Sequence, residues 1–506
     1  MTRLIKKIKS LGWRFFGLPV ALVAFWGISV LIMPTVPRDA VDRGETPRLY
    51  PDYDGCVVPA NIAPLNFEIQ ESEGADREWL VEIEGSTGEG GRITLRGKTA
   101  KIPTRRWRRL LKANAGASII ARIYRQGEDR DWKARGGFEV KVATQSVDRW
   151  AHYRLIEPSY EYGNVIALKS RDLTSFDERT LATNESFGQK PCLNCHSFQD
   201  RDAERFLFHY RDVDFPENSG TIFVDGKKAE KRVLKGSGEL SCAYPAWRPT
   251  GPFVAFSENK TRQIFHTVDT KKVDVFDIES RLAIYNVETG ELIENKTSKD
   301  RFDTFPSWSP DGEYLYFCTA TVALKGEGDD ARAKDAQARI KEFKYDIARS
   351  KFDAKTGRLG APEIVVDAAS IGRSAIHPRV SPDGKFLVYT QCDYGTFPIW
   401  HKESDLMICD LGTGETRPLD ALNSRYAESY HSWDSSGRWL LFSSRRGDGH
   451  FTRLWLAHVD AEGVAAKPFP LPQGNPASDR TLLKSYNVPE LTRNRPTVSG
   501  RKLARF

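Results

Sequence analysis

Five consecutive residues of this 506-residue chain, Cys192-Leu-Asn-Cys-His196, have the types and spacing to hold a cofactor. Two thiols separated by two residues and followed at once by an imidazole form the attachment signature of c-type haem. The sulfurs form thioethers with the vinyl groups, and the histidine reaches the iron from one face. The motif therefore predicts one covalent haem c, bound by Cys192 and Cys195, with His196 as the proximal iron ligand.

Three other interpretations of this motif remain open: a redox dithiol, half of a zinc site and a structural disulfide. A redox dithiol usually lies in a thioredoxin-like βαβ unit, and the surrounding sequence does not have that pattern. A zinc site needs a second pair of ligands, and none is close in the sequence. Haem is the interpretation that we favour.

The sixth ligand of the iron is not fixed by the sequence. Met407 is the only methionine after Met33, and it alternates within an apolar stretch, which favours packing over ligation. His209 is the first candidate and His152 the second. The alternative for both is a histidine that only packs within a strand. An open sixth position would favour small-molecule chemistry instead.

A sequence repeat in the C-terminal part of the chain predicts the fold that positions the haem-binding motif and its candidate ligands. Four segments combine an aromatic residue or histidine, a short strand, a tight turn and a buried strand. Pro presets such turns, and Gly supplies the positive φ that they need. Four strands per repeat, repeated radially, make a β-propeller. We predict about six blades over residues 206–490; the four segments are residues 244–257, 305–318, 377–390 and 430–443.

Propeller topology puts five histidines on one face. Residues that precede an inner strand and residues that follow a second strand lie at the same end of a blade, which we call the top face. The functional interpretation of these histidines is a metal ion in the propeller, a haem-facing pocket or a proton relay. The alternative is that each histidine caps its blade through backbone hydrogen bonds. The predicted cluster is His266, His377, His401, His431 and His450.

The N-terminal residues 1–37 predict export. Five basic residues precede an uncharged run from Phe15 to Met33, which is long enough to cross a bilayer as one helix. The basic flank should stay cytoplasmic, so this signal-anchor would place the bulk of the chain in the periplasm, on the inner membrane. A cleaved signal peptide is the alternative.

The remaining segments complete an all-β chain. Residues 38–64 look like a linker, and residues 65–145 alternate as in a small β-sandwich that is similar to fibronectin type III modules. Residues 146–205 form the expected haem c-binding segment, and residues 491–506 a basic tail. The net charge of +7 comes from 75 basic and 68 acidic residues, and five of the basic ones precede the membrane span. We therefore expect no nucleic-acid partner.

Roughly residues 60–490 resemble bacterial TolB-like propellers that carry a haem-binding Cys-x-x-Cys-His segment. The resemblance implies a Gram-negative periplasm and no particular substrate. A looser similarity to the large subunit of hydrazine synthase implies no such activity, because the C-terminal haem motifs expected there are missing. The resemblance rests on Cys192-Leu-Asn-Cys-His-Ser-Phe198, Tyr244-Pro-Ala-Trp247, Phe305-Pro-Ser-Trp-Ser-Pro-Asp-Gly312 and Tyr430-His-Ser-Trp433.

Taken together, these features predict a membrane-anchored periplasmic mono-haem protein like a c-type cytochrome. The propeller would be the docking platform for a redox or binding partner, and electron transfer is the favoured function. One alternative is a haem- or metal-dependent redox enzyme that uses the top face. Another is a TolB-like binding or assembly protein in which the haem is a sensor or a structural element.

Overall fold

The computed structural model describes most of the chain beyond the N-terminal residues. The predicted anchor and the side chain of Cys192 lie outside the described residues. Within the described part, no helix is long and apolar enough to cross a membrane. The described residues are 47–71, 78–128, 131–157, 165–187, 192–211, 219–234, 241–267, 271–295 and 297–503.

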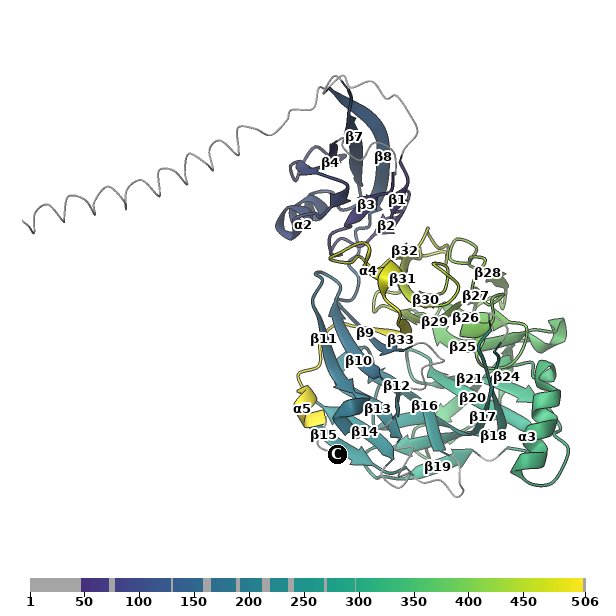
Figure 1. Ribbon diagram of the computed structural model, residues 1–506. Helices are drawn as coiled ribbons and strands as arrows, with labels where there is room; N and C mark the ends of the chain where they lie inside the picture. The colour runs from purple at the N-terminus through teal and green to yellow at the C-terminus, as the bar shows by residue number, and fades with distance from the viewer. Residues whose placement is uncertain are drawn as a thin grey trace, which may run out of the picture.

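Two sheets packed on a common core form the first domain (Figure 1). Helix α2 (Thr104–Ala113) buries Trp107, Leu110 and Leu111 against them. This domain starts earlier than residue 65, because part of the expected linker supplies two of its strands. One sheet contains β1 (Leu49–Tyr50), β3 (Phe67–Ile69) and β6 (Thr99–Ala100), and the other β2 (Val57–Val58), β8 (Trp132–Val142), β7 (Ser118–Gln126), β4 (Trp79–Gly85) and β5 (Ile93–Arg96).

Six sheets arranged in a ring form the second domain, which confirms the predicted β-propeller. The innermost strand of each sheet contacts the innermost strands of both neighbouring sheets, so the ring is closed. From the inside outward, the blades are: blade 1, β12 (Cys192–Gln199), β13 (Asp202–Arg211), β14 (Gly220–Asp225) and β15 (Lys228–Arg232); blade 2, β16 (Ser241–Trp247), β17 (Phe253–Phe265), β18 (Val273–Asn286) and β19 (Leu292–Asn295); blade 3, β20 (Arg301–Trp308), β21 (Tyr314–Thr321), β22 (Asp346–Asp353) and β23 (Arg358–Leu359), with β24 (Glu363–Val366) also paired to β22; blade 4, β25 (Ser374–Val380), β26 (Phe386–Cys392), β27 (Asp405–Asp410) and β28 (Thr416–Pro418); blade 5, β29 (Glu428–Trp433), β30 (Trp439–Ser444), β31 (Arg453–His458) and β32 (Phe469–Pro470); blade 6, β33 (Ser485–Thr492), β9 (Trp150–Ile156), β10 (Ile166–Asp172) and β11 (Glu178–Thr183).

Blade 6 is assembled from both ends of the propeller sequence. The last strand, β33, pairs antiparallel with β9, which comes first (Figure 1). Two predicted boundaries are therefore wrong. Residues 146–205 are not a separate haem segment, since they supply β9 to β11 and the inner strand of blade 1. The predicted basic tail does not begin at residue 491, since Leu491 belongs to β33 and Leu503 is buried in a core shared with blades 1 and 6.

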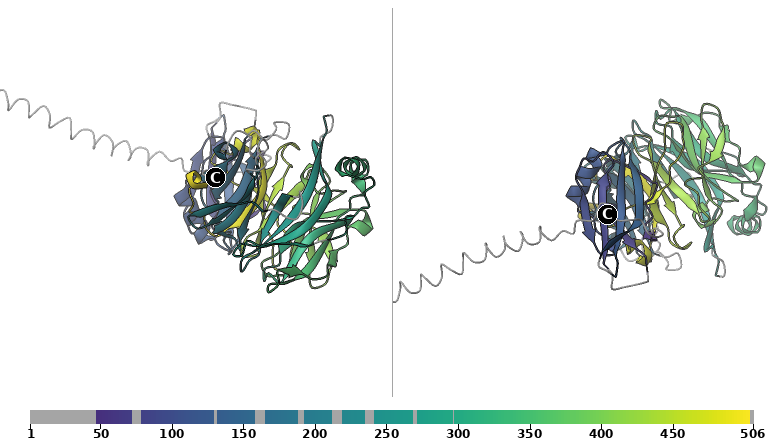
Figure 2. Two further views of the ribbon diagram at one scale, coloured as in Figure 1. Left: turned by 90° about the horizontal axis from the view of Figure 1, so that it is seen from below. Right: turned by 90° about the horizontal axis from the view of Figure 1, so that it is seen from above.

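The first domain and the propeller share a hydrophobic core. Trp439 and Phe469 of blade 5 and Tyr486 of blade 6 pack in the same cluster as Tyr53 and Val58 of the first domain. Figures 1 and 2 show the first domain against one side of the propeller and helix α3 on the opposite side. The other short elements are α3 (Asp329–Ala338), which covers β18, α4 (Ser478–Thr481), α5 (Gly500–Leu503) and the 3-10 turns η1 (Asn184–Phe187), η3 (Ile340–Glu342), η4 (Ala369–Ile371) and η5 (Pro398–Trp400).

Candidate functional site

Each of the six innermost strands contains one non-glycine residue in the left-handed region, with φ between 45° and 58°. The strand pairing shifts its register at this point in every blade, which is the mark of a β-bulge. Left-handed residues other than glycine are uncommon, so a sixfold recurrence reflects the architecture. We call this set the axial ring: Cys195, Tyr244, Phe305, His377, Tyr430 and Val488.

Four members of the axial ring contact one another through their side chains. The ring centroids of Tyr244 and Phe305 are 4.2 Å apart, those of Phe305 and His377 4.6 Å, and those of His377 and Tyr430 5.0 Å. Burial raises the pKa of Tyr430 to about 12 and lowers that of His377 well below its ordinary value. The aromatic part of the ring is therefore uncharged at neutral pH.

The Cys-x-x-Cys-His motif is part of this repeat. Cys195 and His196 take the same positions in β12 that Tyr430 and His431 take in β29. In blades 2 to 4 and blade 6, proline follows the axial-ring residue. The motif therefore lies on the innermost strand of a blade, and it is not carried by a helix or a separate domain.

His196 is buried, and its Nε2 has no hydrogen-bond partner. Nε2 lies 3.8 Å from Oε1 of Glu490, which is longer than a hydrogen bond. Burial, together with the positive charge of Arg154, lowers the pKa of His196 to about 3, so the imidazole is neutral. His431, at the equivalent position, is different, because its Nε2 donates a hydrogen bond to the carbonyl of Val388 at 3.0 Å.

Cys195 also stands apart from the other cysteines of the described part of the chain, because it alone is not buried. The rest are Cys56, Cys242, Cys318, Cys392 and Cys409, all buried. Burial raises the pKa of the Cys392 thiol to about 12 and that of Cys409 to about 11, which keeps both protonated and unreactive. These residues are packing groups, whereas Cys195 is accessible to chemistry.

In these respects the described residues fit a c-type haem. Attachment needs an accessible thiol beside a neutral imidazole with a vacant nitrogen, and Cys195 with His196 supplies both. The Nε2 of His196 has no hydrogen-bond partner among the described residues, which leaves it available to bind iron. One ring nitrogen of His152, of His209 and of His431 is likewise without a partner, so this feature is not unique to His196.

The two candidate sixth ligands occupy different surroundings. His209 on β13 lies opposite Asn194 in the register, and burial lowers its pKa to about 4. His152 on β9 packs on the ring of Phe198 at 4.4 Å, while the ring of His196 is 5.8 Å from the same phenylalanine. The structure thus brings His152 into the surroundings of His196. The Nε2 of His152 is hydrogen-bonded to the hydroxyl of Thr492 at 2.7 Å.

The five top-face histidines do not form one cluster, which corrects that prediction. His377 and His431 lie on inner strands, and the other three lie on loops farther out along the blades. His266 and His401 do meet, on Asp274, at 2.9 and 3.6 Å. The ammonium of Lys271 is 2.8 Å from the same carboxylate and supplies the positive charge there. Nowhere in the described ranges do three or more histidine, cysteine or acidic side chains form a group that could hold a metal ion.

The carboxylate of Asp274 is the centre of this smaller site. Burial opposes its ionisation, but hydrogen bonds from His401, Lys271 and His266 lower its pKa to about 2. His401 is also bonded through Nδ1 to Glu403 at 2.9 Å. This outer cluster is a set of polar contacts around Asp274, and it links the β17–β18 hairpin to the loop after η5.

Two residues that line the central channel between the inner strands were not identified from the sequence. Glu490 and Arg379 lie two positions after the axial-ring residue, where blades 1, 3 and 5 have serine. Burial raises the pKa of Glu490 to about 7, although Arg379 and Arg201 oppose the shift. The sequence did mark Arg379, because it stands where two of the aligned repeats have serine. Nothing in the sequence marked Glu490, because β33 is not followed by the turn residues that identify the other repeats.

No protein-family model and no curated protein matched this chain. Solved structures that resemble it include TolB from Acinetobacter baumannii, with 14% identity, 77% of this chain and 85% of that chain covered, and a TM-score of 0.43. Hydrazine synthase of Kuenenia stuttgartiensis has 12% identity, with 70% of this chain and 48% of that chain covered and a TM-score of 0.42. A chain of the nidogen–laminin complex has 9% identity, with 68% of this chain and 99% of that chain covered and a TM-score of 0.39. These likenesses carry no functional argument, and the fold is established by the sheets themselves.

Proposed function

We propose that this protein binds one haem c covalently and transfers electrons. The single observation that carries the proposal is the pairing of a partly exposed cysteine, Cys195, with the buried, neutral imidazole of His196, whose Nε2 has no hydrogen-bond partner in the described part of the chain. Cys192 and Cys195 would hold the haem, and His196 would bind the iron. The bound haem would supply one-electron exchange with a partner.

The chain's own residues would then set the surroundings of the haem. The aromatic members of the axial ring give the centre of the propeller an uncharged side beside the cofactor, while Glu490 and Arg379 line the adjoining channel. The neutral state of His196 leaves its nitrogen available as a ligand at any pH above about 3. The closed ring of blades provides a rigid platform for a docking partner.

The location that belongs to this proposal is the periplasmic side of the inner membrane of a Gram-negative bacterium. The basic residues and the uncharged run before residue 34 support an uncleaved anchor with a cytoplasmic N-terminus. Haem c is attached outside the cytoplasm, so export and haem attachment support each other. The first domain, with its two packed sheets, suits a spacer of the fibronectin type III kind between the membrane and the propeller.

The test is expression of the full chain together with a c-type haem maturation system. A haem-stained denaturing gel then shows whether the haem is covalent. We expect covalent haem in the wild type and in Cys409→Ala, which removes a buried thiol of blade 4 as the matched control. Cys195→Ala should lose the stable attachment. A wild-type chain without covalent haem would overturn the proposal.

The absorption spectrum then separates electron transfer from small-molecule chemistry. A low-spin iron with two histidine ligands fits electron transfer, and a high-spin iron that binds cyanide identifies an open site. His209→Ala and His152→Ala test the two candidate sixth ligands. The variant that converts a low-spin spectrum to a high-spin one identifies the ligand.

A further inference from the structure

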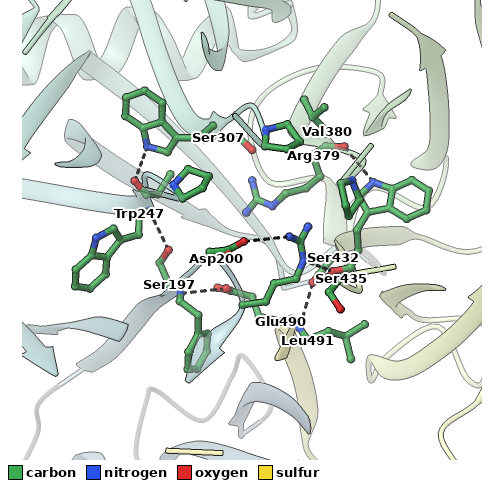
Figure 3. A pocket seen from close by; sticks show the side chains of 18 of the residues that line it. Ser197, Asp200, Trp247, Ser307, Arg379, Val380, Ser432, Ser435, Glu490 and Leu491 are labelled. Atoms are coloured by element: carbon green, nitrogen blue, oxygen red, sulfur yellow. Dashed lines mark hydrogen bonds and ion pairs between the residues drawn. The ribbon is translucent and has the colours of Figure 1, made fainter. Parts of the chain in front are cut away.

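A cavity of about 350 Å³ lies between the inner strands, beside the axial ring, and opens between the turns that follow these strands (Figure 3). Three indoles and several prolines form its apolar walls. One residue of each blade lines it two positions after the axial-ring residue. These six are Ser197, Ala246, Ser307, Arg379, Ser432 and Glu490.

Arg379 is the only basic residue at this level of the channel. Its Nη1 donates to the carbonyl of its neighbour Pro378 at 3.0 Å. In the described part of the chain, no carboxylate lies within 4 Å of its guanidinium, whereas Arg493, nearer the opening, is 3.2 Å from Asp200. Most of the donors of Arg379 are thus left for a ligand.

The neighbours of Arg379 leave room for a ligand beside it. Ser307 and Ser432 occupy the equivalent positions in the two flanking blades, and both are small and carry a hydroxyl. Figure 3 shows the Arg379 side chain extending into the opening from its strand. The guanidinium lies between two short hydroxyl side chains, so the site is concave and all three groups can donate hydrogen bonds to an anion.

We infer that this cavity binds a small organic carboxylate, received by the guanidinium of Arg379 and the hydroxyls of Ser307 and Ser432. The planar guanidinium fork matches a carboxylate with two parallel hydrogen bonds. The walls formed by Trp308 and Trp433 suit an apolar body behind the charged group. The volume lies at the lower end of the range for ligand pockets, which limits the ligand to a few carbon atoms or one ring.

The binding test uses the purified full chain and isothermal titration calorimetry, with succinate, benzoate and inorganic phosphate as probes. At least one of the two carboxylates should bind more tightly than phosphate. Arg379→Gln should weaken that carboxylate about 10- to 100-fold, as expected for the loss of charge-assisted hydrogen bonds. Arg349→Gln is the matched control, because Arg349 is paired with Glu363 at the outer part of blade 3.

One further variant keeps the inference falsifiable. Arg379→Lys retains the positive charge but not the two parallel donors of the guanidinium, and should weaken carboxylate binding less than Arg379→Gln does. The inference is overturned if neither carboxylate binds, if phosphate binds more tightly than both, or if a folded Arg379→Gln chain binds as the wild type does.

Discussion

Replacement of Glu490 by glutamine should stabilise the propeller at alkaline pH. The pKa of Glu490 rises from 4.5 to about 7 because its carboxyl is buried on the innermost strand of blade 6. Between these two values the folded chain holds a proton that the unfolded chain has released, so stability falls as the pH rises through this window. Each tenfold change in proton affinity is worth about 1.4 kcal/mol, so ionising Glu490 in the folded chain costs at most about 3.5 kcal/mol.

The measured effect should be smaller than this limit, about 1 to 3 kcal/mol, because 22% of the Glu490 side chain is exposed to water. The assay is urea unfolding of the wild type and Glu490→Gln at pH 5, 6, 7 and 8. The difference between the two chains cancels the other titrating groups. Glu462→Gln, at an exposed turn, is the control. A difference that stays flat with pH, or that favours the wild type at pH 8, would refute the reasoning.

Two further variants test the packing and the inner strands. Trp439→Ala empties a fully buried site in the core shared by the two domains, and should cost about 3–5 kcal/mol in urea unfolding. Trp132→Ala, at a less buried position, should cost much less. His431→Leu leaves the carbonyl of Val388 without its buried partner and should cost about 1–3 kcal/mol at pH 7. Burial lowers the pKa of His431 to about 3, so the wild type loses stability as the pH falls below 6.5, and the variant should lose less between pH 7 and pH 5. An equal loss in both chains would contradict this.

The repeats made four of the six blades predictable. Blades 2 to 5 each carry a turn residue that permits a tight reversal after the inner strand, such as Gly312. Blade 1 turns without glycine, through Asp200 and Arg201, at φ of 44° and 56°. No local sequence pattern predicts that turn. Blade 6 is formed by strands from opposite ends of the propeller sequence, and no local pattern specifies such a pairing.

The candidate site was predictable by residue type but not by position. Cys195 and His196 were identified from their spacing alone. Their placement on an inner strand depends on a bulge that six blades share, and this becomes visible only when the strands are superposed in register. Glu490 and Arg379 line the same channel because their strands are brought to one axis. Sequence separation hides that proximity.

The closure of blade 6 also fixes the order of events during biosynthesis. Strand β9 is made before every other strand of the propeller, and its partner β33 is the last. Until β33 arrives, the edge of β9 presents unpaired backbone groups, which are a template for pairing with any other extended chain. A nascent chain halted before residue 485 therefore holds an open sheet edge and no channel. The final strand pairs with that edge and closes the ring of blades within one chain.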